Sequence, residues 1–215
     1  MKPLRFTSED TFLQEAVNEL IHKYKCHTVL LYGSRARGDA TEKSDYDLMG
    51  VRKSGKKFRI GEKRDGKYLD IFVFSEKSLK KPGEEHLYMK DAKLLFDIDG
   101  YGSRFLRKLK ILAKRPFRSL PDDEIQALGV WAYKMLERIS IGDVEANYRR
   151  SWLQEQLLVD YFIIRKKRYT GSKASFAWLK KNDLGTYKLF EKVLMKPTDI
   201  KLLTKLVERV TELKL

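Results

Sequence analysis

The stretch VLLYGSRARGDATEKSDYDLMGV, residues 29–51, decides the fold of this chain. Its first four residues are apolar and β-prone, and they stop at Gly33, as a buried strand stops at a turn. The Gly33-Ser34 corner is expected to open a short helix, and a polar loop follows it. A second apolar run then carries Asp45 and Asp47 at its head. The stretch therefore predicts two strands joined through a polar segment.

The residues at the ends of these two runs have complementary chemistry. Asp45 and Asp47 are two positions apart, so in a strand they would point to one face, about 6.5 Å apart along the chain. Two carboxylates on one face repel each other unless a cation lies between them, and magnesium completed by phosphate oxygens fits best. Gly33-Ser34 supplies free N–H groups and a hydroxyl, which suit an anion. This pattern predicts a site for a nucleoside triphosphate.

A third aspartate lies in a predicted hairpin. Asp65-Gly66 is a strong turn dipeptide between two apolar stretches, residues 58–60 and 68–74. Within the second strand Asp70 shares a face with aromatic residues, where an unpaired carboxylate would be costly to bury. A metal site would remove that cost. The alternative is an aspartate bonded to backbone N–H groups.

The spacing of these residues resembles a known motif. Gly33-Ser34, ten intervening residues, Asp45-Tyr46-Asp47 and a later strand aspartate, Asp70, are similar to the motif of the DNA polymerase β-like nucleotidyltransferase superfamily. The similarity is greatest to its small bacterial branch of minimal and antibiotic nucleotidyltransferases, and it covers residues 27–75. It implies an α+β fold, with a small twisted mixed β-sheet domain followed by an α-helical bundle.

The resemblance also implies an activity and roles. Two Mg²⁺ ions held by Asp45, Asp47 and Asp70 would bring an acceptor hydroxyl to the α-phosphate of a nucleoside triphosphate, with ATP the expected substrate. Asp70 would serve the ion nearer the acceptor, and pyrophosphate would leave. Gly33 and Ser34 would bind the triphosphate. Arg35 and Arg37 are further candidates for phosphate contact, although one of them is expected to pair with Asp39 on the surface.

The helical half offers two supporting candidates. Antibiotic nucleotidyltransferases use an acidic base and a phosphate-binding lysine from this half. The resemblance therefore implies Asp160 as the base, with Glu155 as the other candidate, and Lys173 as the lysine, in a glycine-bearing loop. The alternatives are a structural ion pair for Asp160 with a nearby arginine and an ordinary solvated loop at Lys173.

Breaks in the pattern define the domain organisation. Pro116 and Pro121 interrupt the chain, so we expect a nucleotidyltransferase catalytic domain at residues 1–115 and a helical C-terminal domain at residues 116–215. Thr7 or Ser8 is expected to cap a first helix. Apolar residues at 3–4 spacing predict helices near residues 103–113, 125–139, 144–164 and 200–210.

Composition limits the class of protein. The chain has 215 residues, of which 42% are hydrophobic and 35% charged, and no apolar run approaches the length of a membrane helix. A single cysteine, Cys26, excludes an intramolecular disulfide, and no signal peptide is recognisable, so the expected location is the cytoplasm. The net charge of +15 favours anionic partners.

The acceptor stays open at this point, as does the oligomeric state. A small molecule, a protein and RNA are all possible acceptors, although the net charge of +15 disfavours a polycationic drug. Two alternatives to the general activity remain. One is a nucleotide-binding regulatory or antitoxin-like module that acts on a protein partner, and the other is terminal nucleotide addition to RNA.

Overall fold

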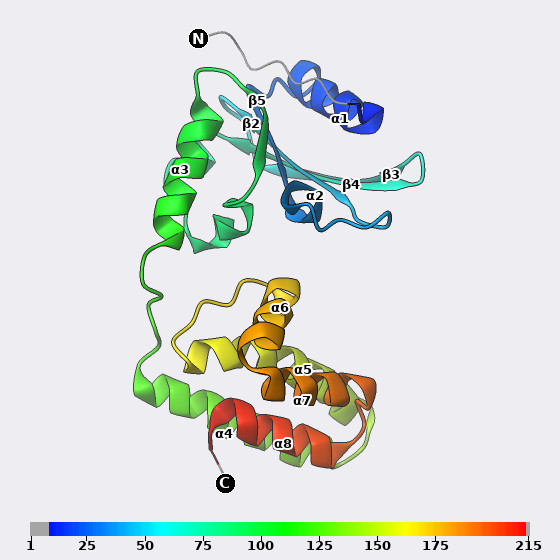
Figure 1. Ribbon diagram of the computed structural model, residues 1–215, viewed down its shortest axis with the longest axis vertical. Coiled ribbons are helices and arrows are strands. Elements are labelled where there is room, and N and C mark those ends of the chain that lie inside the picture. Colours follow the sequence, from blue (N-terminus) through cyan, green and yellow to red (C-terminus); the bar gives the residue numbers. More distant parts are fainter. Residues whose placement is uncertain (1–8, 214–215) are drawn as a thin grey trace. The chain divides into compact units, whose positions relative to one another are not determined.

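The computed structural model describes residues 9–213, which form two compact units that divide between Arg115 and Pro116 (Figure 1). The first unit combines a sheet with helices, and the second is entirely helical in its regular structure. The predicted α+β class, a mixed sheet followed by helices, is confirmed.

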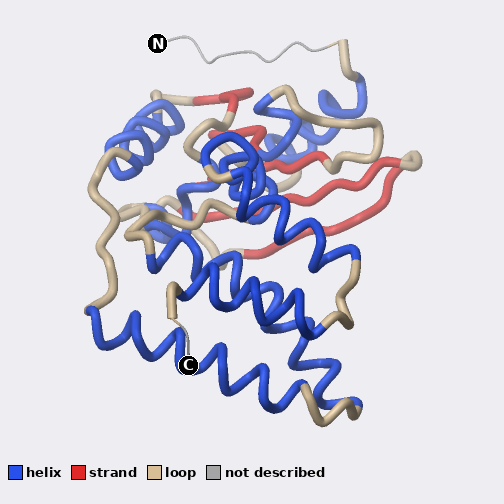
Figure 2. The backbone as a smooth tube through the Cα atoms, turned by 60° about the horizontal axis from the view of Figure 1, so that its bottom comes forward, coloured by secondary structure: helices blue, strands red, loops and turns tan. Residues whose placement is uncertain are grey.

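The first unit is built on a five-stranded sheet with the order β3-β4-β2-β1-β5. Its central pair, β2 and β4, is parallel, and the other neighbours are antiparallel. Figures 1 and 2 show the β3–β4 hairpin extending beyond the other strands. Its turn has positive φ at Asp65 and Gly66, 50° and 77°, as a two-residue hairpin turn requires. The strands are β1 Thr28–Tyr32, β2 Tyr46–Arg52, β3 Phe58–Arg64, β4 Lys67–Ser75 and β5 Lys93–Asp97.

The two faces of this sheet bury different helices because side chains alternate along each strand. Helix α1, Thr11–His22, packs on one face over residues that include Leu48 and Ile71. Helix α3, Tyr101–Ala113, packs on the other face over residues that include Met49 and Phe74. Two short 3₁₀ helices, η1 Lys77–Leu79 and η2 Glu84–Met89, contribute to that second face.

The cap of α1 differs from the prediction. Asp10 caps the helix, with its carboxylate accepting from Leu13 N at 3.2 Å. Thr7 and Ser8 lie outside the described residues. Asp10 also accepts from the hydroxyl of Tyr46 at 2.7 Å, so the start of α1 is held to the start of β2.

The second unit is a bundle around one apolar core, in which Leu157, Phe190 and Leu206 are buried. The predicted helices are present, but Lys173 is not in a loop. The loop ends at Gly171, and Lys173 lies in the first turn of the next helix. Asp183 then ends that helix and caps another one, accepting from Thr186 N at 3.1 Å. The helices are α4 Asp122–Ile139, α5 Val144–Ile164, α6 Ser172–Asn182, α7 Leu184–Met195 and α8 Ile200–Thr211.

Across residues 9–213, none of the helices combines the length and the apolar character needed to cross a membrane.

Candidate functional site

The site begins where β1 ends. Helix α2, Gly33–Arg37, follows β1 directly, and Gly33 has a φ of 72°, in the region that favours glycine. A Cβ at this position would lie 2.8 Å from Asp47 Cγ and closer still to its carboxylate oxygen. Only glycine therefore allows the backbone of this corner to lie directly against the Asp47 side chain.

Asp47 and Asp70 are register partners on the parallel strands β2 and β4. Side chains of partnered residues in neighbouring strands share a face, and both aspartates lie on the α3 face, two positions before Met49 and Phe72. Asp45 differs from the prediction, because β2 begins at Tyr46 and leaves Asp45 exposed just before the strand. The sheet thus brings two of the three aspartates side by side, with the third at the entrance to β2.

The charges of Asp45 and Asp70 act on Asp47. Burial, and then the charges of Asp45 and Asp70, raise the pKa of Asp47 to about 6. Arg37 and Arg35 act weakly in the opposite direction. Asp47 therefore sits in a field of like charge that its neighbouring arginines do not cancel.

Asp70 has a partner of its own. Arg59 from β3 donates Nε and Nη2 to the two carboxylate oxygens of Asp70, at 2.7 and 2.8 Å. This bidentate pair holds Asp70 within the hairpin. Across residues 9–213, no three or more His, Cys, Asp or Glu side chains are gathered as a metal ion would require. The carboxylates are therefore neighbours without forming a complete cage.

Comparison with known proteins identifies the family of part of the chain. Residues 13–115 match the family model of the nucleotidyltransferase domain. The first unit is a nucleotidyltransferase domain. The expected family is confirmed, and nucleotidyl transfer is the general activity of the family.

Among solved structures, a nucleotidyltransferase-like protein from Exiguobacterium sibiricum aligns with a TM-score of 0.44 and 13% sequence identity. The alignment covers 93% of this chain and 74% of that one. No curated protein sequence matches the chain.

The aspartates of the nucleotidyltransferase domain fit a divalent cation by their chemistry. Carboxylate oxygens are the donors that magnesium prefers. A cation would also relieve the repulsion that raises the pKa of Asp47. Asp45 and Asp47 are available as they lie, whereas Asp70 already accepts two hydrogen bonds from Arg59 and would bind an ion through its remaining lone pairs.

Arg35 has a different position from the one predicted for a phosphate ligand. Its guanidinium donates to the main-chain oxygens of Ser44 and Asp45, at 2.7 and 3.2 Å, and lies 3.7 Å from the ring centroid of Tyr46. These contacts hold the loop that carries Asp45 against α2. Arg37 is the residue that pairs with Asp39, at 3.3 Å. Arg35 is thus engaged with the protein itself, while Ser34 remains beside the Gly33 corner.

Sequence reasoning missed two groups at the nucleotidyltransferase site. Arg59 could have been found, because the predicted Asp65-Gly66 turn sets a register that puts it diagonally across from Asp70. Tyr88 could not, since no local pattern connects η2 to the aspartates. Its ring packs edge-on against Tyr32 at 5.3 Å. Burial, then Asp70 and Asp47, raise the pKa of Tyr88, which places its hydroxyl near the carboxylates.

The remaining predicted residues belong to the second unit. Asp160 has no exposed surface, and Gln156 Nε2 donates to its Oδ1 at 2.8 Å. Its Oδ2 has no hydrogen-bond partner, and burial raises the pKa of Asp160 to about 6. An enclosed carboxylate cannot accept a proton from a substrate, so Asp160 does not suit a base as it lies. Glu155 and Lys173 are exposed.

Proposed function

We propose that this protein transfers a nucleoside monophosphate from a nucleoside triphosphate to an acceptor hydroxyl, with magnesium bound and pyrophosphate released. The observation that carries the proposal is the side-by-side placement of Asp47 and Asp70 on parallel strands, against the Gly33 corner. The match of residues 13–115 to the nucleotidyltransferase domain supports the same reaction.

The residues of the corner would bind the phosphates. Gly33 lets the main chain approach closely, and the N–H groups at the start of α2 together with the Ser34 hydroxyl can donate to phosphate oxygens. Arg35 belongs to α2 and donates to the main-chain oxygens of Ser44 and Asp45. It therefore holds the loop that ends at Asp45 against this corner. Positioning of this kind is the main contribution a protein makes to phosphoryl chemistry.

Asp45, Asp47 and Asp70 would hold the metal. When bound, magnesium would stabilise negative charge on the attacking and leaving oxygens. Asp47 is ionised at neutral pH even with its raised pKa of about 6, so it can act as a ligand without further activation. Asp70 is oriented by Arg59, which donates to both of its carboxylate oxygens.

The net charge of the chain favours some classes of acceptor over others. A chain with a net charge of +15 attracts anions, so RNA or an acidic protein is favoured over a cationic small molecule. Asp160 has no part in this mechanism, because its carboxylate is enclosed. Lys173 remains a candidate for phosphate contact, since it is exposed in the first turn of α6.

An assay with labelled ATP tests the proposed reaction. The protein is incubated with magnesium and ATP labelled at either the α- or the γ-phosphate, together with separate pools of cell protein, RNA and small metabolites. We expect α-label to enter one pool and pyrophosphate to appear, while γ-label enters none. Transfer of γ-label, or equal transfer of α-label by the parent and Asp70→Asn, would contradict the proposal.

Salt concentration then separates the acceptors. Transfer to RNA should fall steeply as salt is added, because binding to the strand releases counterions. Transfer to a small molecule should change little. Replacing ATP by the other nucleoside triphosphates in the same assay tests the preference for ATP.

A further inference from the structure

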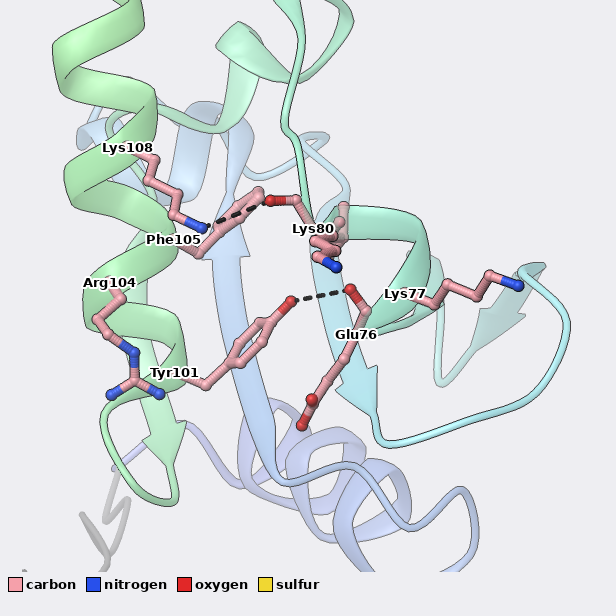
Figure 3. A pocket seen from close by; sticks show the side chains of 8 residues that line it. Glu76, Lys77, Lys80, Tyr101, Arg104, Phe105 and Lys108 are labelled. Carbon is pink, nitrogen blue, oxygen red and sulfur yellow. Dashed lines mark hydrogen bonds between the residues drawn. The ribbon is translucent and has the colours of Figure 1, made fainter.

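The first unit contains a cavity of about 520 Å³ at the other end of the sheet from the aspartates. It lies between η1 and the first turns of α3 (Figure 3). Asp70 is near the start of β4, and Glu76 directly follows the last residue of that strand. At about 3.3 Å per residue, these two positions are about 20 Å apart. The cavity is lined by Glu76, Lys77, Leu79, Lys80, Tyr101, Arg104, Phe105 and Lys108.

The rim of the cavity is strongly cationic. Half of the lining residues are basic, and within residues 9–213 none of these four forms an ion pair with a carboxylate. Arg104 donates to the main-chain oxygen of Asp99 at 2.6 Å, and Lys108 donates to that of Lys80 at 3.5 Å. Figure 3 shows Lys108 reaching from α3 toward the main chain at Lys80, while Lys77 points away from the helix.

The single carboxylate of the lining does not balance this charge. Glu76 is the one acidic residue among four basic residues of the lining, and its Oε1 lies 3.0 Å from His27 Nε2. The main-chain oxygen of Glu76 accepts from the Tyr101 hydroxyl at 3.5 Å. Three cations, Lys80, Arg104 and Lys108, are therefore left around one cavity with unused donors. Like charges gathered in this way repel one another until an anion joins them.

The floor of the cavity is apolar and aromatic. Leu79 and Phe105 are 1% and 3% exposed, and Tyr101 is half-buried beside them. A bare inorganic anion would make no use of such a floor. A ring that carries a phosphate would use both parts, because a base can lie on aromatic side chains while cations bind its phosphate. The cavity volume is in the range of small-ligand sites.

We propose that this cavity binds a nucleoside phosphate, at a second site that is separate from the aspartates and needs no metal. The base would lie over Tyr101, whose ring is only partly buried, and the phosphate would contact Lys80, Arg104 and Lys108. The same chemistry can come from a free nucleotide or from one nucleotide of an RNA strand. The inference is independent of the proposed transfer reaction, since none of these residues belongs to the aspartate site.

Helix α3 supplies a matched pair of variants for the test. Arg104→Gln with Lys108→Gln removes two charges from the rim. Arg107→Gln with Lys110→Gln removes the same two types of charge from exposed positions of α3 that do not line the cavity. The probe is a fluorescent AMP analogue, titrated against the full chain in EDTA and followed by anisotropy. Thermal melting checks that each variant is folded.

We expect the rim variant to bind the probe at least about tenfold more weakly, because it loses two charge-assisted contacts to the phosphate. The control variant should stay within about twofold of the parent. Asp45→Asn with Asp47→Asn should also bind the probe normally, which separates this site from the aspartates. Equal weakening in the rim and control variants, or no binding by the parent, would overturn the proposal.

Competition identifies the source of the ligand. AMP should displace the probe, and failure to do so would mean that the fluorophore binds and would contradict the proposal. Displacement by a short single-stranded oligoribonucleotide at a much lower concentration than AMP supports a strand, and equal or weaker displacement by the oligoribonucleotide supports a free nucleotide. Both results should depend on Arg104 and Lys108. If inorganic phosphate or polyglutamate displaces the probe as well as either of them, the aromatic floor has no role and a nucleoside ligand is wrong.

Discussion

Asp47 and Asp160 have the same raised pKa, about 6, but they lie in very different surroundings. Burial is the leading cause in both cases. At Asp47 the charges of Asp45 and Asp70 add to it, and the carboxylate lies against a glycine corner. At Asp160 the only other influence is the hydrogen bond from Gln156, which lowers the pKa. Neighbouring carboxylates indicate a site for a cation, whereas a single enclosed carboxylate indicates only that its burial is unfavourable.

The largest expected effect separates the two aspartates by activity. Asp47→Asn should reduce nucleotidyl transfer by about a thousandfold or more, because it removes charge where developing charge must be stabilised. Asp160→Asn should stay within about twofold of the parent. Initial rates of α-label transfer measure both. A large loss of activity in Asp160→Asn would indicate that Asp160 is a catalytic base and would contradict the difference expected between the two aspartates.

Stabilisation by magnesium and ATP should also depend on Asp47 and not on Asp160. Magnesium with ATP at a hundred times its dissociation constant should stabilise the protein by about 2.7 kcal/mol, since a ligand of the folded state alone shifts the unfolding equilibrium. Asp45→Asn with Asp47→Asn should abolish the part of this shift that depends on magnesium, whereas Asp160→Asn should retain it. Thermal denaturation with and without magnesium measures the difference. An unchanged magnesium-dependent shift in the double variant would place the metal elsewhere.

The third prediction concerns the glycine that distinguishes the Asp47 environment. Gly33 and Gly38 both have positive φ, 72° and 83°, but only a Cβ at Gly33 would meet Asp47. Gly38→Ala should cost about 1 kcal/mol of stability, from the backbone alone. Gly33→Ala should cost about 2 kcal/mol more, because Asp47 must move. Urea denaturation measures both variants, and equal losses would mean that the Asp47 contact has no energetic weight.

Much of the first unit could be predicted because its signals are local. The Gly33-Ser34 corner, the Asp65-Gly66 turn and the alternation around Asp70 each depend on neighbours in the sequence, and each is present in the structure. The apolar run puts Asp45 at the head of the second strand, whereas β2 begins at Tyr46. Strand ends depend on pairing with other strands, which a single run does not reveal.

The arginines could not be assigned in the same way. Arg35 looks like a phosphate ligand because it follows a phosphate-binding corner, yet its Nε and Nη2 donate to the loop that returns ten residues later. Arg59 lies far from the motif in sequence and reaches Asp70 only through the hairpin register. Tyr88 depends on the packing of η2 against β1. The contacts of a long side chain depend on the tertiary structure, and a local sequence pattern does not determine them.

The smallest expected effect is the change in stability caused by Asp160→Asn. The pH dependence of that change tests most directly whether the buried carboxylate of Asp160 destabilises the fold. The folded pKa of about 6 lies above the ordinary value of 3.8, so the unfolded chain loses its proton first as the pH rises. The parent should therefore lose stability between about pH 4 and pH 6 through this residue, and the loss should persist above pH 6. The full shift corresponds to about 3 kcal/mol, and the unpartnered amide of the variant offsets part of it, so a net gain of about 1 kcal/mol is expected at pH 7.5.

That gain should shrink as the pH falls and reach zero between about pH 5 and pH 6. Below about pH 4 it should become a loss of about 2 kcal/mol, because the carboxylate of Asp160 is then protonated in both states and only the cost of the unpartnered amide remains. Urea denaturation of parent and variant at several pH values measures it, with and without magnesium. Because no other carboxylate contributes to the raised pKa of Asp160, magnesium should leave the difference between the two proteins unchanged. A gain that magnesium removes would mean that Asp160 also faces the metal. A gain that is independent of pH would mean that its carboxylate is not the source of the instability.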